Sequence, residues 1–226
     1  MSERVAIVAG AGGELGRATA EKLAAAGFTV AGVDRNREAL KDLPDGIRCE
    51  AADPADPAAA RSVVDRIAAE VGPPEVLVNT IGTYRLGEAL TATPEDLWLM
   101  INVNVGAALW LTQAVVPYLR DRGSGSVVHV VARPGLEPTA GMAAYAVSKA
   151  ALVHLTRVLD LELRPLGIRV NAVAPQLIDT AKNRPYITPD LLAHAVAPEA
   201  VADIIVYLVS DAAAPVSGAV VPAYSA

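Results

Sequence analysis

The stretch VAGAGGELGRATAEKLAAAGFTVAGVD, residues 8–34, decides the fold of this chain. It starts inside an apolar run typical of a buried strand, Arg4–Ala9, and continues into a loop rich in glycine. A helical pattern follows from about residue 14 to residue 26, and then a second apolar run, Phe28–Asp34. Strand, glycine turn, helix and strand in this order predict a parallel βαβ unit.

The glycines of this loop suggest what the unit binds. Glycine permits a sharp turn, and without a Cβ the backbone N–H groups at a helix N-terminus can approach a phosphate. Asp34 ends the second strand, eighteen residues after Gly16. A carboxylate at that point suits the two hydroxyls of an adenosine ribose and repels a 2′-phosphate. A plain glycine turn beside a solvated acid is the alternative interpretation, which the strand–loop–helix context disfavours.

The pattern therefore predicts a dinucleotide site that favours NAD(H). Arg35, the next residue, keeps NADP(H) as the alternative, because a guanidinium pairs with a phosphate.

The rest of the chain repeats the alternation of strand and helix. Further apolar strands are expected at residues 46–51, 75–80, 125–132, 167–175 and 218–223, with helices at 56–72, 94–123, 141–164 and 197–211. Apolar strands between helices indicate parallel strands that are covered on both faces. We expect one α/β domain over residues 1–226, a Rossmann-type doubly wound parallel sheet of about seven strands with helices on both faces.

Composition excludes several classes of function. A net charge of −6 without a basic run argues against nucleic acid as a partner. Cys49 is the only cysteine, which excludes an internal disulfide, and the N-terminus does not resemble a secretory signal, so we expect a cytoplasmic protein. Gln113 and Pro117 interrupt the most apolar segment, and no membrane span is expected. One cysteine and three scattered histidines predict no metal site.

Tyr145 and Lys149 stand out in the helical stretch GMAAYAVSKAALVHL, residues 141–155. Residues four apart share one face of a helix. Tyrosine ordinarily has a pKa of about 10, and a neighbouring ammonium lowers it, so the pair suits proton transfer near neutral pH. The alternative is a surface tyrosine beside a snorkelling lysine.

Six motifs occur in order along nearly the whole chain: the glycine loop (10–16), AADPAD (51–56), VNTIG (78–82), INVNVG (101–106), YAVSK (145–149) and VNAVAPQLIDT (170–180). With these motifs the chain resembles the short-chain dehydrogenase/reductase family. The resemblance implies a seven-stranded Rossmann-type fold and an NAD(P)-dependent oxidoreductase that acts on a small molecule. It also implies a homodimer or a homotetramer.

The resemblance implies roles for residues at matching positions. Tyr145 would donate a proton, Lys149 would bind the nicotinamide ribose, and Asn104 would hold a water that relays protons through Lys149. Asp53 would contact the adenine amino group. The implied cofactor contacts are Gly10, Gly12, Gly13, Glu14, Leu15, Gly16, Asp34, Arg35, Asp53, Asn79, Gly82, Tyr145, Lys149, Ile178 and Thr180.

Departures from the family pattern concern the substrate. The family usually has a serine about thirteen residues before the tyrosine, and that position is Ala132 here. Glu14 replaces the usual middle glycine of the loop. The loop and the segments PTAGMAAYAVSK (138–149) and LIDTAKNR (177–184) are similar to those of dihydropteridine reductases within the family, which implies a pterin-like substrate with an activated C=N bond.

Two alternatives stay open. One is a ketone or 3-oxoacyl reductase that tolerates the loss of the serine. The other is a cofactor-binding regulatory or structural protein with little turnover, which Ala132 favours and the set of Tyr145, Lys149 and Asn104 opposes.

Overall fold

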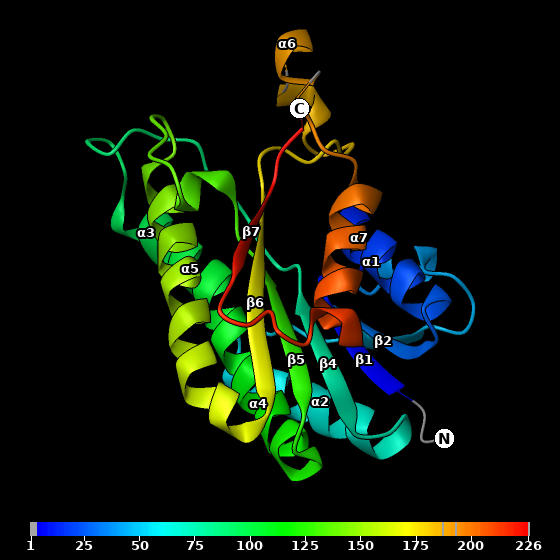
Figure 1. Ribbon diagram of the computed structural model, residues 1–226. Helices are drawn as coiled ribbons and strands as arrows, with labels where there is room; N and C mark the ends of the chain where they lie inside the picture. The colour runs from blue at the N-terminus through cyan, green and yellow to red at the C-terminus, as the bar shows by residue number, and fades with distance from the viewer. Residues whose placement is uncertain (1–3, 187, 193, 226) are drawn as a thin grey trace.

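The computed structural model describes residues 4–186, 188–192 and 194–225. Within these ranges seven parallel strands form one sheet in the order β3-β2-β1-β4-β5-β6-β7, in agreement with the predicted fold (Figure 1). The strands are β1 (Arg4–Ala9), β2 (Phe28–Asp34), β3 (Arg48–Ala51), β4 (Pro74–Asn79), β5 (Gly125–Val130), β6 (Ile168–Pro175) and β7 (Val220–Ala223). Residues 1–3, 187, 193 and 226 of the expected domain lie outside the described part of the chain.

Helices cover both faces of the sheet, as Figure 1 shows. Helices α1 and α7 pack on one face, and α2, α4 and α5 pack on the other. The helices are α1 (Glu14–Ala25), α2 (Pro57–Glu70), α3 (Pro94–Ile101), α4 (Ala107–Arg122), α5 (Ala143–Leu163), α6 (Pro189–Leu192) and α7 (Pro198–Val209).

Strand β1 shows why the central strands are apolar along their whole length. Its side chains alternate between the two faces of the sheet. Ala6 and Val8 belong to the core under α1 and α7, whereas Val5 and Ile7 belong to the core under α2, α4 and α5. Both sets are buried, so neither face leaves room for a polar residue.

The expected helix at residues 94–123 consists of three parts. Thr93 and Asp96 form a capping box that starts α3, and Gly123, at φ +73°, ends α4 in the left-handed conformation. Between α3 and α4 the chain makes a π-helical turn, Asn102–Gly106. Such turns insert one extra residue and often occur at functional sites. Here the turn contains Asn104.

Together α3, the π turn and α4 make a continuous helical segment of 29 residues, Pro94–Arg122. By length and composition this segment is apolar enough to cross a membrane, although the sequence predicted no segment of that kind. Leu111, Val115 and Leu119 of α4 pack in the core beneath the sheet. This burial accounts for the apolar side chains of α4 that face the sheet.

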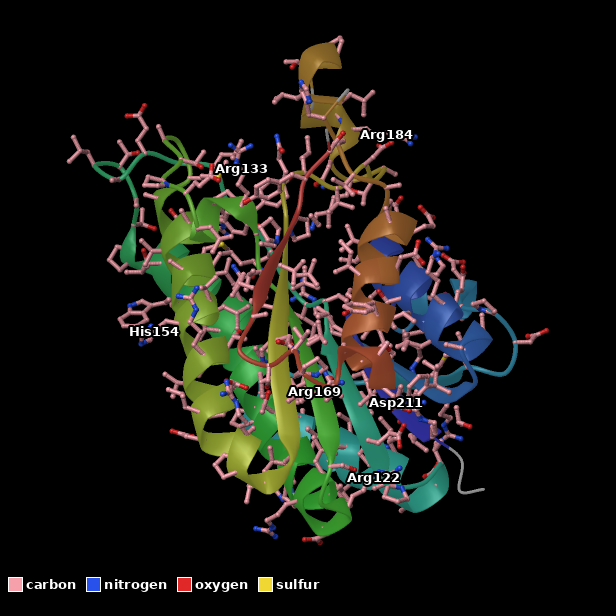
Figure 2. All side chains as sticks on the ribbon, viewed as in Figure 1. Arg122, Arg133, His154, Arg169, Arg184 and Asp211 are labelled. Atoms are coloured by element: carbon pink, nitrogen blue, oxygen red, sulfur yellow. The ribbon has the colours of Figure 1, made fainter. Side chains whose placement is uncertain are left out.

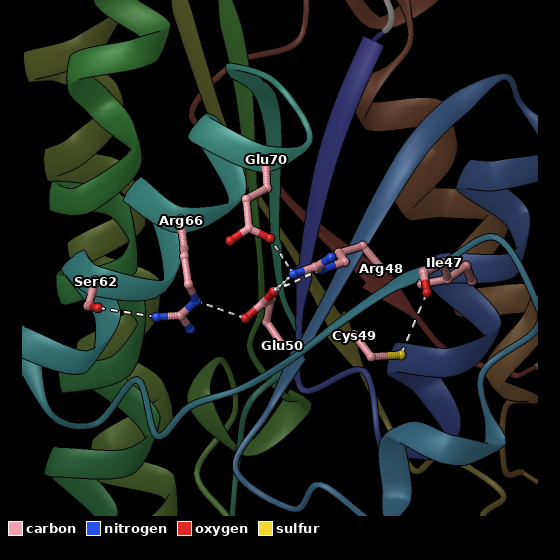
Figure 3. Close-up of polar contacts among 7 residues, drawn as sticks. All are labelled: Ile47, Arg48, Cys49, Glu50, Ser62, Arg66 and Glu70. Atoms are coloured by element: carbon pink, nitrogen blue, oxygen red, sulfur yellow. Dashed lines mark hydrogen bonds and ion pairs between the residues drawn. The ribbon is translucent and has the colours of Figure 1, made fainter.

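Charged side chains tie the edge strand β3 to α2 (Figure 3). Glu50 is almost buried and accepts hydrogen bonds from Arg48 at 2.9 Å and from Arg66 of α2 at 3.0 Å. Arg48 also pairs with Glu70 at the end of α2. The charged side chains of this edge strand are therefore paired with each other and with α2.

The strand order reverses between β1 and β4, because β2 lies on one side of β1 and β4 on the other. In doubly wound sheets the crevice at the carboxyl end of such neighbouring strands binds ligands. The loops that follow the strands gather at that end, where Figure 2 places Arg133 and Arg184, far from Arg122 at the opposite end.

Candidate functional site

Two adjoining cavities open at the carboxyl ends of β1 and β4. The first, of about 550 Å³, is lined by the glycine loop together with Tyr145 and Lys149, as well as Ile178 and Thr180. The second, of about 270 Å³, is lined by residues that include Asp34, Arg35 and Asp53. The two cavities share Gly10, Gly13, Thr80, Gly82, Thr83 and Lys182. Because they share six lining residues, one extended ligand can occupy both cavities.

Packing requires glycine at two positions of the loop. Gly10 has φ +85°, and a Cβ there would lie 2.5 Å from the Thr80 hydroxyl oxygen. A Cβ on Gly16 would lie 2.0 Å from the Gly10 carbonyl oxygen. Gly13 is exposed, and a Cβ there would make only an ordinary contact, at 3.4 Å. The backbone at the start of α1 is therefore open to the first cavity, as a diphosphate group would require.

The carboxylate of Asp34 is held in place by the backbone of two loops. One oxygen accepts a hydrogen bond from the Gly12 N–H at 3.1 Å, and the other accepts from the Asn36 N–H at 2.8 Å. A Cβ on Gly12 would lie 2.7 Å from the Ala39 Cβ and 3.0 Å from the Asp34 carboxylate, so glycine favours this close approach. The sequence predicted that the loop and this acid belong to one site, and they lie side by side.

Glu14 lines the first cavity, but its carboxylate contacts protein rather than open space. It accepts a hydrogen bond of 2.7 Å from the N–H of Ala181, in the segment that follows β6. Within this segment Thr180 also lines the cavity, and Arg184 pairs with Asp179 at 2.6 Å. The acid that replaces a family glycine thus fastens the segment after β6 to the start of α1.

Tyr145 and Lys149 occupy one face of α5, as the spacing predicted. The Lys149 nitrogen lies 6.0 Å from the centre of the Tyr145 ring and donates a hydrogen bond of 2.9 Å to the carbonyl oxygen of Val130. Burial lowers the pKa of Lys149 to about 8. Tyr145 has a pKa raised to about 12 by burial and, to a smaller extent, by Tyr84.

These values correct one expectation drawn from the sequence. The sequence suggested that Lys149 and a positively charged nicotinamide together lower the pKa of Tyr145, whereas the protein's own groups raise this pKa. Loss of solvent around a phenol disfavours the phenolate, and the lysine donates its hydrogen bond to the backbone instead of to the phenol.

Asn104 is buried and holds the loop after β4. Its oxygen accepts a hydrogen bond from the Thr83 N–H at 2.8 Å, and its nitrogen donates to the Thr83 carbonyl at 3.0 Å and to the Ser148 hydroxyl at 2.9 Å. Gly82 lies between Asn104 and Lys149, and a Cβ on it would be 3.2 Å from the Lys149 nitrogen. Asn104 therefore connects the loop after β4 to α5.

Asn79 lies at the end of β4, beneath the two cavities rather than in them. Its side chain is fully buried and lines neither cavity. The side-chain oxygen accepts a hydrogen bond from the Ile81 N–H at 3.1 Å and so shapes the turn at the end of β4. Ala132 is also buried and lines neither cavity, so no hydroxyl is present where the family usually has its serine.

The first cavity also has polar residues that the sequence motifs did not assign to the site, among them Thr80, Tyr84 and Lys182. Tyr84 packs edge to face against Tyr145, with 6.2 Å between ring centres. The ammonium of Lys182 lies 5.8 Å from the centre of the Tyr84 ring. These residues come from irregular loops without periodicity, so no spacing in the sequence assigns them a place in the site.

Comparison with known proteins agrees with this geometry. Residues 4–190 match the family model described as short chain dehydrogenase. The 2,3-dihydro-2,3-dihydroxybenzoate dehydrogenase of Bacillus subtilis (strain 168) is 36% identical over 184 residues, which are 78% of this chain and 70% of that protein. The 3-oxoacyl-[acyl-carrier-protein] reductase FabG of Thermotoga maritima is 31% identical over 233 residues, which are 96% of this chain and 95% of that protein.

A solved structure extends the likeness to the fold of the whole chain. The crystal structure of ribose-5-phosphate isomerase from Brucella melitensis 16M superposes with a TM-score of 0.93 at 26% identity, covering 99% of this chain and 92% of that one. The motifs, the doubly wound sheet and these matches together show that the chain belongs to the short-chain dehydrogenase family and is an oxidoreductase.

Proposed function

We propose that this chain binds NAD(H) across both cavities and reduces an activated C=N or C=O group of a small molecule. The family as a whole uses NAD(P)(H). The observation that carries the proposal is that the glycine loop, Tyr145 and Lys149 line the same cavity. Residues 1–226 form the cofactor site and the substrate site in one domain.

The residues of the two cavities fit a dinucleotide. The glycine loop and the start of α1 hold the diphosphate, and Asp34 binds the adenosine ribose in the second cavity, where Asp53 also lies. Lys149 would bind the nicotinamide ribose, and Ile178 and Thr180, which line the same cavity, would contact the nicotinamide. The bound nicotinamide supplies or accepts the hydride.

Tyr145 is the proton donor. With a pKa of about 12, the phenol is protonated at neutral pH, and the substrate heteroatom becomes basic enough to take this proton as the hydride adds to carbon. Lys149 has a pKa of about 8, so its ammonium form predominates at pH 7 and can bind ribose hydroxyls. Asn104 holds Thr83 and the surrounding loop in the position that this chemistry needs.

Asp34 supports a preference for NAD(H) over NADP(H). Its carboxylate is fixed by the Gly12 and Asn36 N–H groups, and a 2′-phosphate beside it would be repelled. Arg35 lines the same cavity and would reduce the preference by pairing with a phosphate. We expect NADH to bind more tightly than NADPH.

Ala132 supports a substrate that is already activated. A conjugated imine, as in a quinonoid pterin, accepts hydride with less polarisation than a simple ketone. A ketone or 3-oxoacyl reductase is the second candidate, because the relative from Thermotoga maritima carries that name. A homodimer or homotetramer in the cytoplasm completes the proposal, since members of the family are commonly oligomeric.

Fluorescence titration with NADH and NADPH followed by initial rates tests the proposal. The substrate panel consists of a quinonoid dihydropterin, simple ketones and a 3-oxoacyl thioester. Turnover of the pterin with NADH supports the first candidate, and turnover of the thioester supports the second. Binding of NADH without turnover of any substrate contradicts the enzymatic proposal and favours a regulatory or structural protein.

The matched pair Tyr145→Phe and Tyr118→Phe then tests the proton donor. Tyr118 bonds Asp65 on the surface and lines neither cavity, so its variant undergoes the same chemical change away from the site. Tyr145→Phe should bind NADH normally and lose about 10²-fold or more in kcat. Full activity of Tyr145→Phe would disprove this role.

A further inference from the structure

The loop that carries Tyr84 is fixed to the rest of the site on both sides. On one side Asn104 bonds both the N–H and the carbonyl of Thr83, at 2.8 Å and 3.0 Å. On the other side Gly87 forms an isolated bridge with Met142, just before α5. The backbone of Tyr84 is therefore held between the π turn and the start of α5.

The second attachment also relates Tyr84 to Tyr145. The Gly87 N–H donates to the Gly141 carbonyl at 2.8 Å, and the Ala143 N–H donates to the Gly87 carbonyl at 3.1 Å. Ala143 is the first residue of α5, and Tyr145 follows two residues later. Two backbone hydrogen bonds thus connect the loop after β4 to the start of the helix that carries the proton donor.

The two phenol rings meet inside the first cavity. Their centres lie 6.2 Å apart at an interplanar angle of 69°, and both side chains line the cavity. Lys182 approaches the Tyr84 ring from a third segment, with its ammonium 5.8 Å from the ring centre, within the range of a cation–π contact. Tyr84 also contributes to the raised pKa of Tyr145, which indicates that the two phenols interact.

The reaction leaves one task without a residue. A carbonyl oxygen that receives a proton has a further lone pair, and an imine nitrogen gains one as the hydride adds to carbon. In either case a second hydrogen-bond donor at that atom stabilises the charge that develops. Ala132 has no hydroxyl and lies outside the cavity. We propose that the hydroxyl of Tyr84 donates this second hydrogen bond to the acceptor atom of the substrate.

This inference rests on the proposed function and adds a catalytic residue to it. In the reduction, the C=N or C=O π bond is replaced by a new C–H bond and a new N–H or O–H bond. The hydride supplies two electrons and the hydrogen on carbon, and Tyr145 supplies the proton on the heteroatom. Tyr84 keeps its own proton and acts only by hydrogen bonding.

Tyr84→Phe is the decisive variant, because it keeps the ring contacts with Tyr145 and Lys182 and removes only the hydroxyl. Its kcat should fall by about 10²-fold, the usual effect of removing one such donor, and its dissociation constant for NADH should stay within about twofold of the wild type. Tyr118→Phe should retain full activity. Equal kcat values for the Tyr84→Phe and Tyr118→Phe variants would overturn the inference.

A second measurement does not depend on turnover. In protein labelled with ¹³C at the phenolic carbon of tyrosine, the Tyr145 resonance is assigned with the Tyr145→Phe variant. Because Tyr84 raises the pKa of Tyr145, the ionised fraction of Tyr145 at about pH 11 should be larger in Tyr84→Phe than in the wild type. An unchanged fraction would place the Tyr84 hydroxyl too far away and overturn the inference.

The two measurements separate this inference from the proposed function. If the wild type shows no turnover, the proposed reduction is disproved. The ionised fraction of Tyr145 in the wild type and in Tyr84→Phe then still shows whether the Tyr84 and Tyr145 hydroxyls lie close together. A wild type with turnover that Tyr84→Phe retains disproves only the role of Tyr84.

Discussion

The ammonium of Lys149 donates its hydrogen bond to the carbonyl oxygen of Val130, at 2.9 Å, while its nitrogen lies 6.0 Å from the centre of the Tyr145 ring. The lysine is thus anchored to the end of β5, deep in the first cavity and beside Gly82. A buried ammonium with one neutral partner is costly, which is why its pKa falls to about 8. Several consequences of this arrangement and of its surroundings are open to measurement.

Stability should depend on pH through Lys149. Its pKa is about 8 in the folded protein against 10.5 for the free side chain, so the unfolded chain binds more protons between these values. Stability therefore rises with pH across that window, by about 3 kcal/mol for this group. Urea unfolding measures the free energy of unfolding of the wild type and of Lys149→Met. The value for the wild type minus the value for the variant should increase by this amount as the pH rises from about 8 to 10.5.

Lys41→Met is the control for this experiment, because the Lys41 ammonium is exposed and pairs with Glu38. The difference in free energy of unfolding between Lys41→Met and the wild type should change little over the same pH range. A difference between wild type and Lys149→Met that is constant from pH 7 to about pH 11 would contradict the buried ammonium.

Asp34→Ala should reverse or remove the cofactor preference. The variant loses the acceptor for the ribose hydroxyls and the charge that repels a 2′-phosphate, while Arg35 remains. We expect the ratio of NADPH affinity to NADH affinity to rise by about tenfold or more in fluorescence titrations. Glu38→Ala removes a nearby exposed acid and should leave the ratio unchanged. An equal effect of both variants would show that Asp34 acts only through its negative charge and not through contact with the ribose.

Glu14→Ala should loosen the segment after β6. The Glu14 carboxylate accepts the Ala181 N–H, and the adjacent Lys182 is exposed and is a trypsin site. A hydrogen bond worth about 1 kcal/mol corresponds to about a fivefold increase in the open population, and limited trypsinolysis at Lys182 should accelerate accordingly. Glu21→Ala, an exposed acid on the same helix, should be cleaved at the wild-type rate, and the same rate in Glu14→Ala would show that the bond does not hold the segment.

Ala132→Ser should act differently in two backgrounds. Ala132 does not line the first cavity, so the prediction requires that the longer serine side chain reach it. If it does and Tyr84 already supplies the second donor, the serine changes kcat of the wild type by less than about threefold and raises kcat of Tyr84→Phe by about tenfold. A double-mutant cycle of initial rates measures this coupling. Equal effects of the serine in both backgrounds would show that the two hydroxyls do not substitute for each other.

Most of the architecture was predictable from local patterns. The boundaries of β1 and β2 follow from continuous apolar runs, the start of α2 follows from Asp56 and Pro57, and the end of α4 follows from Gly123. The site at the carboxyl ends of the strands was predictable for the same reason, because Gly10–Gly16 and Asp34 belong to one strand–helix–strand unit. The π turn at Asn104 was not predictable from the sequence, because a single extra residue in a helix leaves the period of the apolar residues almost unchanged.

The sequence by itself determined the order of strands and helices, the glycine loop, and the helical face that Tyr145 and Lys149 share. These features depend on residues close together in the chain. Only the tertiary structure decided that Asn79 turns into the core, that Tyr145 has a raised pKa, and that Tyr84 meets Tyr145 across the cavity. Burial and the loss of solvent depend on contacts between segments that are far apart in the sequence. Local sequence patterns do not predict which of these segments come into contact.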